Sequence, residues 1–272
     1  MTWTGGKVKS LLNSATYFPD TFRGALRQPG IYVGEAQMSA GRAGERFYFG
    51  KQEVLSKPSP LALEKGKTHA VECPDGKYHY SVHIPVNYDP ARPVPLLINF
   101  SPGGSGAPLS EKLSDELGWI MAGLTESQNG PLQPPCDNAA AALFDLRCRF
   151  AIDLNRIYFT GFSGGARMAA WMGVLLPDSA GLILIGAGFH PDGSPPLKLP
   201  IFFIVVKTDM NLGEVKGILS KDKGRPMEHI IHPEGHTWGR PEDHEAAIRW
   251  HEKRAAGSGG AGAGVVVVVV VA

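Results

Sequence analysis

The chain has 272 residues, with 27 Lys and Arg against 26 Asp and Glu, which gives a formal net charge of +1. This length suits one large domain with a buried core, and balanced charge without a basic run argues against nucleic acid as a partner. The 34 Gly and 22 Pro residues predict many tight turns, but they are too few for a collagen-like or disordered chain.

Residues 1–60 mix Gly, Pro and polar residues with two short β-like runs at 31–33 and 46–49, and we interpret them as an extension of unassigned role. The start lacks the apolar stretch of a secretory signal peptide. As written, the sequence therefore predicts a cytoplasmic protein, whereas a trimmed or mis-assigned start would fit a secreted one. The main domain is expected over residues 61–256.

The pattern becomes regular from residue 67. Two β-rich segments, 68–73 and 78–84, flank the turn sequence Pro74-Asp75-Gly76 and predict a hairpin. The apolar run VPLLINF at 94–100 is typical of a strand that is buried on both faces of a sheet. A glycine-rich loop follows this strand directly.

The remaining elements alternate between short apolar strands and segments of helical periodicity. Strands are expected at 156–160, 181–185, 200–206 and 227–232, and helices at 109–124, 137–150, 166–176, from about 211, and at 243–254. Asn211 and Glu214 have the spacing of a capping box. This alternation predicts the α/β class, with a mostly parallel sheet covered by helices on both faces and functional sites at the carboxyl ends of its strands.

The C-terminal tail, residues 257–272, joins a linker-like GSGGAGAG segment to seven consecutive valines. Seven apolar residues are too few for a membrane span, which needs about 20 in a helix. The tail is either dispensable or an added edge strand, and we leave it out of the functional argument. Of the three cysteines, Cys136 and Cys148 either form a disulfide or remain free thiols.

The strongest functional motif is Gly161-Phe162-Ser163-Gly164-Gly165, which has the G-x-S-x-G pattern and lies between a predicted strand and a predicted helix. A strand that turns abruptly into a helix exposes the hydroxyl group of the serine, and the flanking glycines let the chain cross itself closely. Ser163 is therefore the predicted nucleophile.

A serine hydroxyl needs a base within hydrogen-bond reach, and the base needs an acid that fixes its tautomer. His236 follows the last strand directly and is the predicted base, with His190 as its rival. Asp209 follows the strand at 200–206 and is the predicted acid. Asp192 is the fallback acid, whereas Asp153 precedes its strand and is expected at the opposite end of the sheet.

An acyl-transfer site also needs amide donors that stabilise the oxyanion of the tetrahedral intermediate. The amide of Gly164 is one candidate, because it follows the nucleophile. Gly103 and Gly104, in the glycine-rich loop after the strand at 94–100, are the others. This loop carries neither the lysine nor the strict G-x-G-x-x-G spacing of a phosphate-binding loop.

These segments resemble the esterase branch of the α/β-hydrolase superfamily, which includes polyhydroxybutyrate depolymerase-like and feruloyl esterase-like enzymes. The resemblance covers about residues 67–253 and rests on IPVNYDPARPVPLLINFSPGGSG, DLNRIYFTGFSGGARMA, KTDMN and GHTW. It implies the α/β-hydrolase fold, nucleophile, acid and base at Ser163, Asp209 and His236, and an oxyanion loop at Gly103 and Gly104. Ser101-Pro102 stands where these enzymes often carry a histidine, and the resemblance therefore does not carry the loop geometry or the substrate range over to this chain. Activity is expected to survive this departure, because amides and not the imidazole form the oxyanion hole.

The expected function is hydrolysis of carboxylic esters through an acyl-enzyme, without a cofactor or a metal ion. Short-chain or aromatic acyl esters, or polyester-like polymers, are the expected substrates, and Phe162, Trp238 and His190 are candidates for binding them. Loops at 106–110, 128–135 and 190–196 are expected to set the specificity. The alternatives are a serine peptidase of the same fold and a catalytically inactive binding protein.

Overall fold

The computed structural model describes residues 34–37, 46–49, 63–73, 76–176, 179–191, 193–233 and 235–257. Within the N-terminal extension, β1 (Gly34–Gln37) pairs antiparallel with β2 (Arg46–Phe49), which confirms the β-like run at 46–49. The run at 31–33, most of the extension and the valine tail lie outside the described residues.

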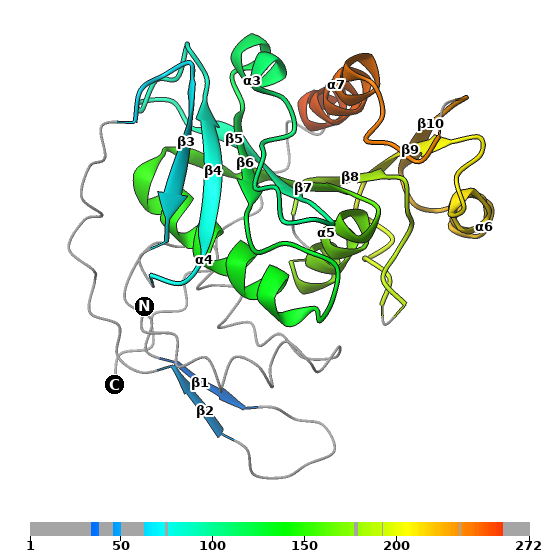
Figure 1. Cartoon of the computed structure of the whole chain (residues 1–272), viewed down its shortest axis with the longest axis horizontal. Helices are drawn as coiled ribbons and strands as arrows, with labels where there is room; N and C mark the ends of the chain where they lie inside the picture. Colours follow the sequence, from blue (N-terminus) through cyan, green and yellow to red (C-terminus); the bar gives the residue numbers. More distant parts are fainter. Residues whose placement is uncertain are drawn as a thin grey trace.

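An eight-stranded sheet forms the centre of the molecule, in the order β10-β9-β8-β7-β5-β6-β4-β3 (Figure 1). Its strands are β3 (Lys67–Glu72), β4 (His79–Ile84), β5 (Val94–Phe100), β6 (Ile120–Leu124), β7 (Ile152–Phe162), β8 (Gly181–Ile185), β9 (Ile201–Val206) and β10 (Met227–His232). The predicted hairpin is the antiparallel pair β3 and β4, and β4 also runs antiparallel to β6. All other pairs are parallel, so the expected mostly parallel sheet is confirmed.

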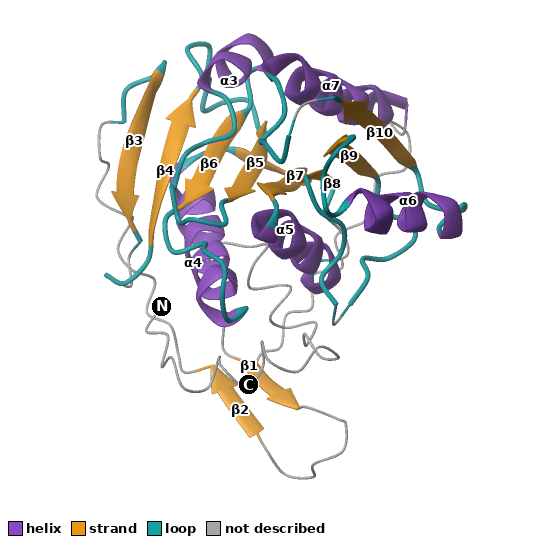
Figure 2. Cartoon of the chain, turned by 45° about the vertical axis from the view of Figure 1, so that its right-hand side comes forward, coloured by secondary structure: helices purple, strands orange, loops and turns teal. Residues whose placement is uncertain are grey.

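Helices cover both faces of this sheet (Figure 2). One face carries α4 (Gln133–Arg149), α5 (Gly164–Leu175) and α6 (Leu212–Lys221), which pack against the larger part of the core through residues such as Leu143, Trp171 and Val215. The other face carries α3 (Glu111–Leu117) and α7 (Pro241–Gly257), which pack through Leu113 and Ile248. The three-layer arrangement leaves the carboxyl ends of the parallel strands at one edge of the sheet.

One predicted element is wrong in part. The helix expected over 109–124 ends at Leu117, where Gly118 adopts a left-handed conformation (φ 70°, ψ 28°), and the rest of the segment forms strand β6. A Cβ on Gly123 would lie 2.1 Å from the carbonyl oxygen of Ala107, so this strand is shaped to pass close to a neighbouring backbone. The sequence of β6 lacks the β-branched residues that would have marked a strand, apart from Ile120.

The capping box predicted at Asn211 and Glu214 does not form. Asn211 occupies the N-cap position of α6, but its side chain makes no capping hydrogen bond. Both side chains instead contact Arg167 of α5, since a guanidinium with bidentate geometry is a stronger partner for Glu214 than a backbone amide.

Cys136 and Cys148 are both free. They lie near the two ends of α4, where 12 residues of helix separate them by about 18 Å, well beyond the reach of a disulfide. Burial also raises the pKa of the Cys136 thiol, which keeps it protonated. Among the described helices, none combines the length and the apolar character needed to cross a membrane.

Candidate active site

Ser163 lies at the sharp turn between β7 and α5, with φ 54° and ψ −117°. It is the only non-glycine residue with positive φ among those that the structure describes. Gly161 and Gly165 make the turn possible, because a Cβ on Gly161 would lie 2.4 Å from the carbonyl oxygen of Gly165. This strand–turn–helix geometry projects the Ser163 hydroxyl at the carboxyl edge of the sheet.

Three predicted side chains meet at this edge. The Oγ atom of Ser163 lies 3.0 Å from Nε2 of His236, and Nδ1 of His236 lies 2.7 Å from Oδ2 of Asp209. A carboxylate only accepts hydrogen bonds, so Nδ1 carries the imidazole proton and Nε2 is free to accept the proton of the serine hydroxyl. The hydroxyl, the imidazole and the carboxylate are therefore in hydrogen-bond contact in series.

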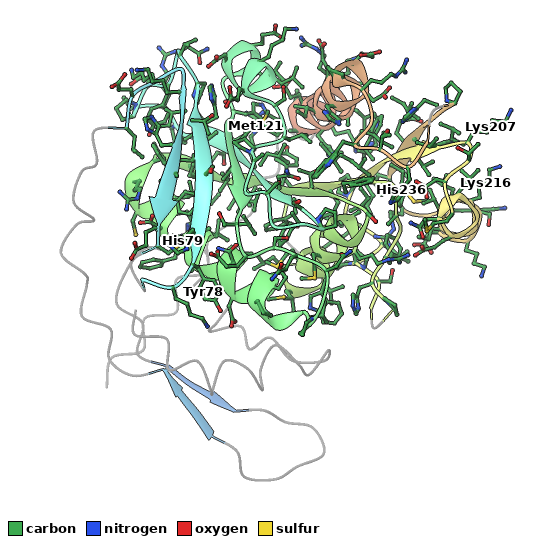
Figure 3. All side chains as sticks on the ribbon, viewed as in Figure 1. Tyr78, His79, Met121, Lys207, Lys216 and His236 are labelled. Atoms are coloured by element: carbon green, nitrogen blue, oxygen red, sulfur yellow. The ribbon has the colours of Figure 1, made fainter. Side chains whose placement is uncertain are left out.

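Each of these residues follows a different parallel strand. Ser163 comes directly after β7, Asp209 three residues after β9, and His236 four residues after β10. The carboxylate of Asp209 is fully buried, and its Oδ1 atom accepts a hydrogen bond from the backbone amide of Asn211 at 2.8 Å. The imidazole of His236 remains 27% exposed, so a substrate can approach it. Figure 3 shows His236 beside the β9 end of the sheet, far from Tyr78 and His79 near β4.

The glycine-rich loop that follows β5 lies next to this turn. A Cβ on Gly165 would stand 2.1 Å from the carbonyl oxygen of Phe100, the last residue of β5. Gly104 adopts φ +68° against the carbonyl of Thr125, and Gly103 forms an isolated antiparallel bridge with Gln128. The loop after β6 therefore holds the loop that carries the candidate oxyanion donors.

Asn129 is a residue of this site that the sequence did not single out, except as part of the loop at 128–135. Its backbone amide donates to the carbonyl of Pro102 at 2.8 Å. Its side chain faces Gly164, because a Cβ on Gly164 would lie 1.7 Å from Asn129 Oδ1. The structure thus places an amide side chain against the residue after Ser163.

The three candidate substrate-binding residues separate into two groups. The ring of Phe162 lies 4.5 Å from that of His236 and 5.2 Å from that of Trp238, and both aromatics pack partly buried against the core beneath α3 and α7. His190 instead contacts Trp171 of α5, with ring centroids 5.3 Å apart, and bridges to Gly193. His236 rather than His190 is the imidazole that contacts Ser163.

The alternative acids are also accounted for. Asp153 lies at the beginning of β7, hence at the edge opposite to Ser163, where its carboxylate accepts from the amide of Asn155. Asp192 lies outside the described residues. Among the residues that are described, no group of three or more His, Cys, Asp or Glu side chains is arranged to hold a metal ion.

No protein-family model matches the sequence, and no curated protein gives a significant match. Solved structures do resemble it. A thermostable esterase superposes with a TM-score of 0.50 and 18% identity, over 69% of this chain and 62% of the other. A feruloyl esterase module from Clostridium thermocellum, complexed with sinapinate, gives 0.54 and 13% over 68% and 86%. Esterase 2 from the planctomycete Thermogutta terrifontis gives 0.52 and 12% over 71% and 92%.

The chain has the α/β-hydrolase fold. The chain spans about 62% of the length of the thermostable esterase. Identities of 12–18% establish the architecture alone. Within this α/β-hydrolase fold, the chemistry depends on the side chains at the carboxyl edge.

Proposed function

We propose that this protein is a serine-dependent carboxylic ester hydrolase. The observation that carries the proposal is the continuous contact from Ser163 through His236 to the buried Asp209, at the carboxyl edge of the sheet. A hydroxyl with a base at 3.0 Å, on a strained turn at a helix N-terminus, is suited to attack an acyl carbon.

The proposed reaction has two halves. The Oγ atom of Ser163 attacks the ester carbonyl carbon while His236 Nε2 takes the hydroxyl proton, and Asp209 stabilises the imidazolium that forms. The oxyanion is stabilised by the amides of Gly164 and Gly104, and by that of Gly103 once it exchanges its present partner, Ser101 Oγ at 3.2 Å, for the oxyanion. His236 then donates its proton to the leaving alcohol oxygen. Water repeats these steps on the acyl-enzyme and releases the carboxylic acid.

The proposed substrates are short-chain or aromatic acyl esters, or polyester-like polymers. The aromatic pair Phe162 and Trp238 beside His236 supports an acyl group of modest size or an aromatic one. The similarity to the structures of esterases, one of them a feruloyl esterase module with sinapinate, agrees with this chemistry.

The test compares wild type with Ser163→Ala on p-nitrophenyl acetate, butyrate and palmitate and on a feruloyl ester. Ser163→Ala should remove nearly all turnover while its circular dichroism and melting temperature stay close to those of wild type. Ser220→Ala, an exposed serine on α6, is the matched control and should retain full activity. A fluorophosphonate probe should label wild type and Ser220→Ala but not Ser163→Ala.

Two results would contradict the proposal. Hydrolysis of peptides but of no ester would favour a serine peptidase. No turnover and no labelling of folded wild type would favour an inactive binding protein. Faster hydrolysis of palmitate than of butyrate would overturn the proposed substrate class but not the mechanism.

A further inference from the structure

Arg167 lies on α5, four residues after Ser163, and its guanidinium contacts two other connections at the carboxyl edge. Nη1 donates to the carbonyl of Phe189 at 2.6 Å, in the connection after β8. Nη1 and Nη2 bind the two carboxylate oxygens of Glu214 at 2.8 and 2.7 Å, at the start of α6 after β9. One side chain of the nucleophile helix thus ties together the segments that follow β7, β8 and β9.

Arg167 also reaches the loop of the acid. Its Nη2 donates to Oδ1 of Asn211 at 3.3 Å, and Nδ2 of Asn211 donates to the carbonyl of Gly186 at 2.8 Å. The backbone amide of the same Asn211 holds Oδ1 of Asp209 at 2.8 Å. Both the oxygen and the nitrogen of the Asn211 side chain are therefore hydrogen-bonded, while its backbone amide holds the carboxylate of Asp209.

The surroundings leave this network little room to shift. A Cβ on Gly188 would lie 2.6 Å from Glu214 Oε1, and a Cβ on Gly186 would lie 3.3 Å from Asp209 Oδ2. Both glycines belong to the connection after β8, which passes between the acid loop and α5. A side chain at either glycine would displace Glu214 or Asp209, so the backbone of this connection restricts where their carboxylates can lie.

Stability alone is a weak reason for this ion pair. The side chains of Arg167 and Glu214 are 28% and 33% exposed, and partly solvated pairs contribute little net folding free energy. The ion pair instead restricts orientation, because a planar guanidinium that binds a carboxylate with two parallel hydrogen bonds limits the rotation of both side chains. Glu214 also neutralises a cation that would otherwise oppose the imidazolium formed on His236.

We propose that Arg167 is a positioning residue for catalysis, which acts through Glu214 and Asn211 to keep the Asp209 carboxylate aligned with His236. The inference rests on the proposed function, because alignment matters only if His236 acts as a base. A carboxylate turned away from Nδ1 would stabilise the imidazolium less, and small misplacements in such sites cost up to about 100-fold in rate.

The test is a double-mutant cycle on kcat between Arg167→Gln and Asp209→Asn. Arg167→Gln alone should lower kcat by about 10- to 100-fold with KM changed less than about twofold. In the Asp209→Asn background the same substitution should change kcat by less than about threefold, because the carboxylate through which it acts is gone. Arg167→Lys keeps the charge but not the planar fork, and should fall between wild type and Arg167→Gln.

Arg225→Gln is the matched control. Arg225 also pairs with an acid, Asp222, and also donates to carbonyls of the β8–β9 connection, those of Pro195 and Pro196. Its hydrogen bonds lead to Asp222, Ser194, Pro195 and Pro196 and away from the Asp209 loop, so any effect on kcat should be equal in both backgrounds. If Arg167→Gln does not fold, Glu214→Gln replaces it in the cycle, since it keeps the shape of the partner and removes its charge.

A second measurement does not depend on ester hydrolysis. The proton on Nδ1 of His236, held by Asp209, should give a far-downfield proton resonance, assigned by its loss in Asp209→Asn. Arg167→Gln should shift or remove this signal, and Arg225→Gln should not. Equal kcat losses in both backgrounds, or an unchanged resonance in folded Arg167→Gln, would overturn the inference. A folded wild type that is inactive on every ester would refute the proposed function, and the resonance would then still show whether Arg167 maintains the contact between Asp209 and His236.

Discussion

The backbones of Gly161 and Gly165 touch where β7 passes into α5: a Cβ on Gly161 would lie 2.4 Å from the carbonyl oxygen of Gly165. On the far side, a Cβ on Gly165 would lie 2.1 Å from the carbonyl oxygen of Phe100. Rigid backbone therefore surrounds both positions, whereas the atom nearest to a Cβ on Gly164 is the side-chain oxygen of Asn129.

Gly165→Ala should consequently destabilise the protein by about 3 kcal/mol or more, because the added methyl group forces two backbone segments apart. Gly164→Ala should cost markedly less, since the Asn129 side chain can rotate away. Melting temperatures of the two variants, measured side by side, check this expectation. Equal melting temperatures would mean that the crossing is looser than these contacts indicate.

Asp209→Asn should lower kcat by about 10³- to 10⁴-fold while the protein stays folded, because an amide in this place favours the wrong imidazole tautomer. Asp153→Asn, at the opposite edge of the sheet, is the control and should retain wild-type turnover. Steady-state kinetics on p-nitrophenyl butyrate measure both. If Asp192→Asn were the damaging substitution instead, the acid would be misassigned.

On p-nitrophenyl acetate, which has no aromatic acyl group, Phe162→Leu should lower kcat by about tenfold with little change in KM, because the aromatic ring beside the imidazole of His236 limits the tilt of the base. Phe150→Leu is the control. Phe150 precedes β7 in the chain and its ring contacts that of Tyr88, so this variant should leave kcat unchanged. A raised KM for aromatic esters, with kcat preserved on every ester, would leave Phe162 its proposed role in substrate binding but none in holding the base.

His251 should make the folded state sensitive to acid. Burial lowers the pKa of this imidazole from 6.5 to about 4, and its Nε2 lies 3.0 Å from the carbonyl oxygen of Leu182. At a pH between these two pKa values, His251 is protonated in the unfolded chain but neutral in the folded protein. The free energy of unfolding therefore falls as the pH drops from about 6.5 towards 4. The melting temperature of His251→Gln should decline less over this range, which thermal scans at stepped pH will show. Parallel declines would contradict this role.

The strands were the most predictable part of the fold. Residues 94–100, 181–185 and 227–232 form β5, β8 and β10 with the expected bounds, because each is a compact run flanked by turn-forming residues. Strand β6 escaped prediction, since it follows α3 after a two-residue link and lacks a strand-like composition. Its apolar residues continued the helical pattern.

The residues of the candidate site also fall into predictable and unpredictable ones. Ser163, Asp209 and His236 could be brought together from sequence, because the carboxyl ends of parallel strands share one edge. Arg167 and Asn129 could not, since their roles depend on which way side chains point across connections distant in the sequence. The spacing of Asn211 and Glu214 indicated a capping box. Both side chains bind Arg167 instead, which could be known only from the position of α5.

The backbone of Ser163 has a thermodynamic consequence of its own. Positive φ at a non-glycine residue costs about 1–3 kcal/mol, a strain that the rest of the fold must sustain. Glycine would relieve most of it. The most stable occupant of position 163 is therefore one that has no hydroxyl group. If Ser163 is the nucleophile as proposed, heat tolerance and reactivity make opposite demands on this one position.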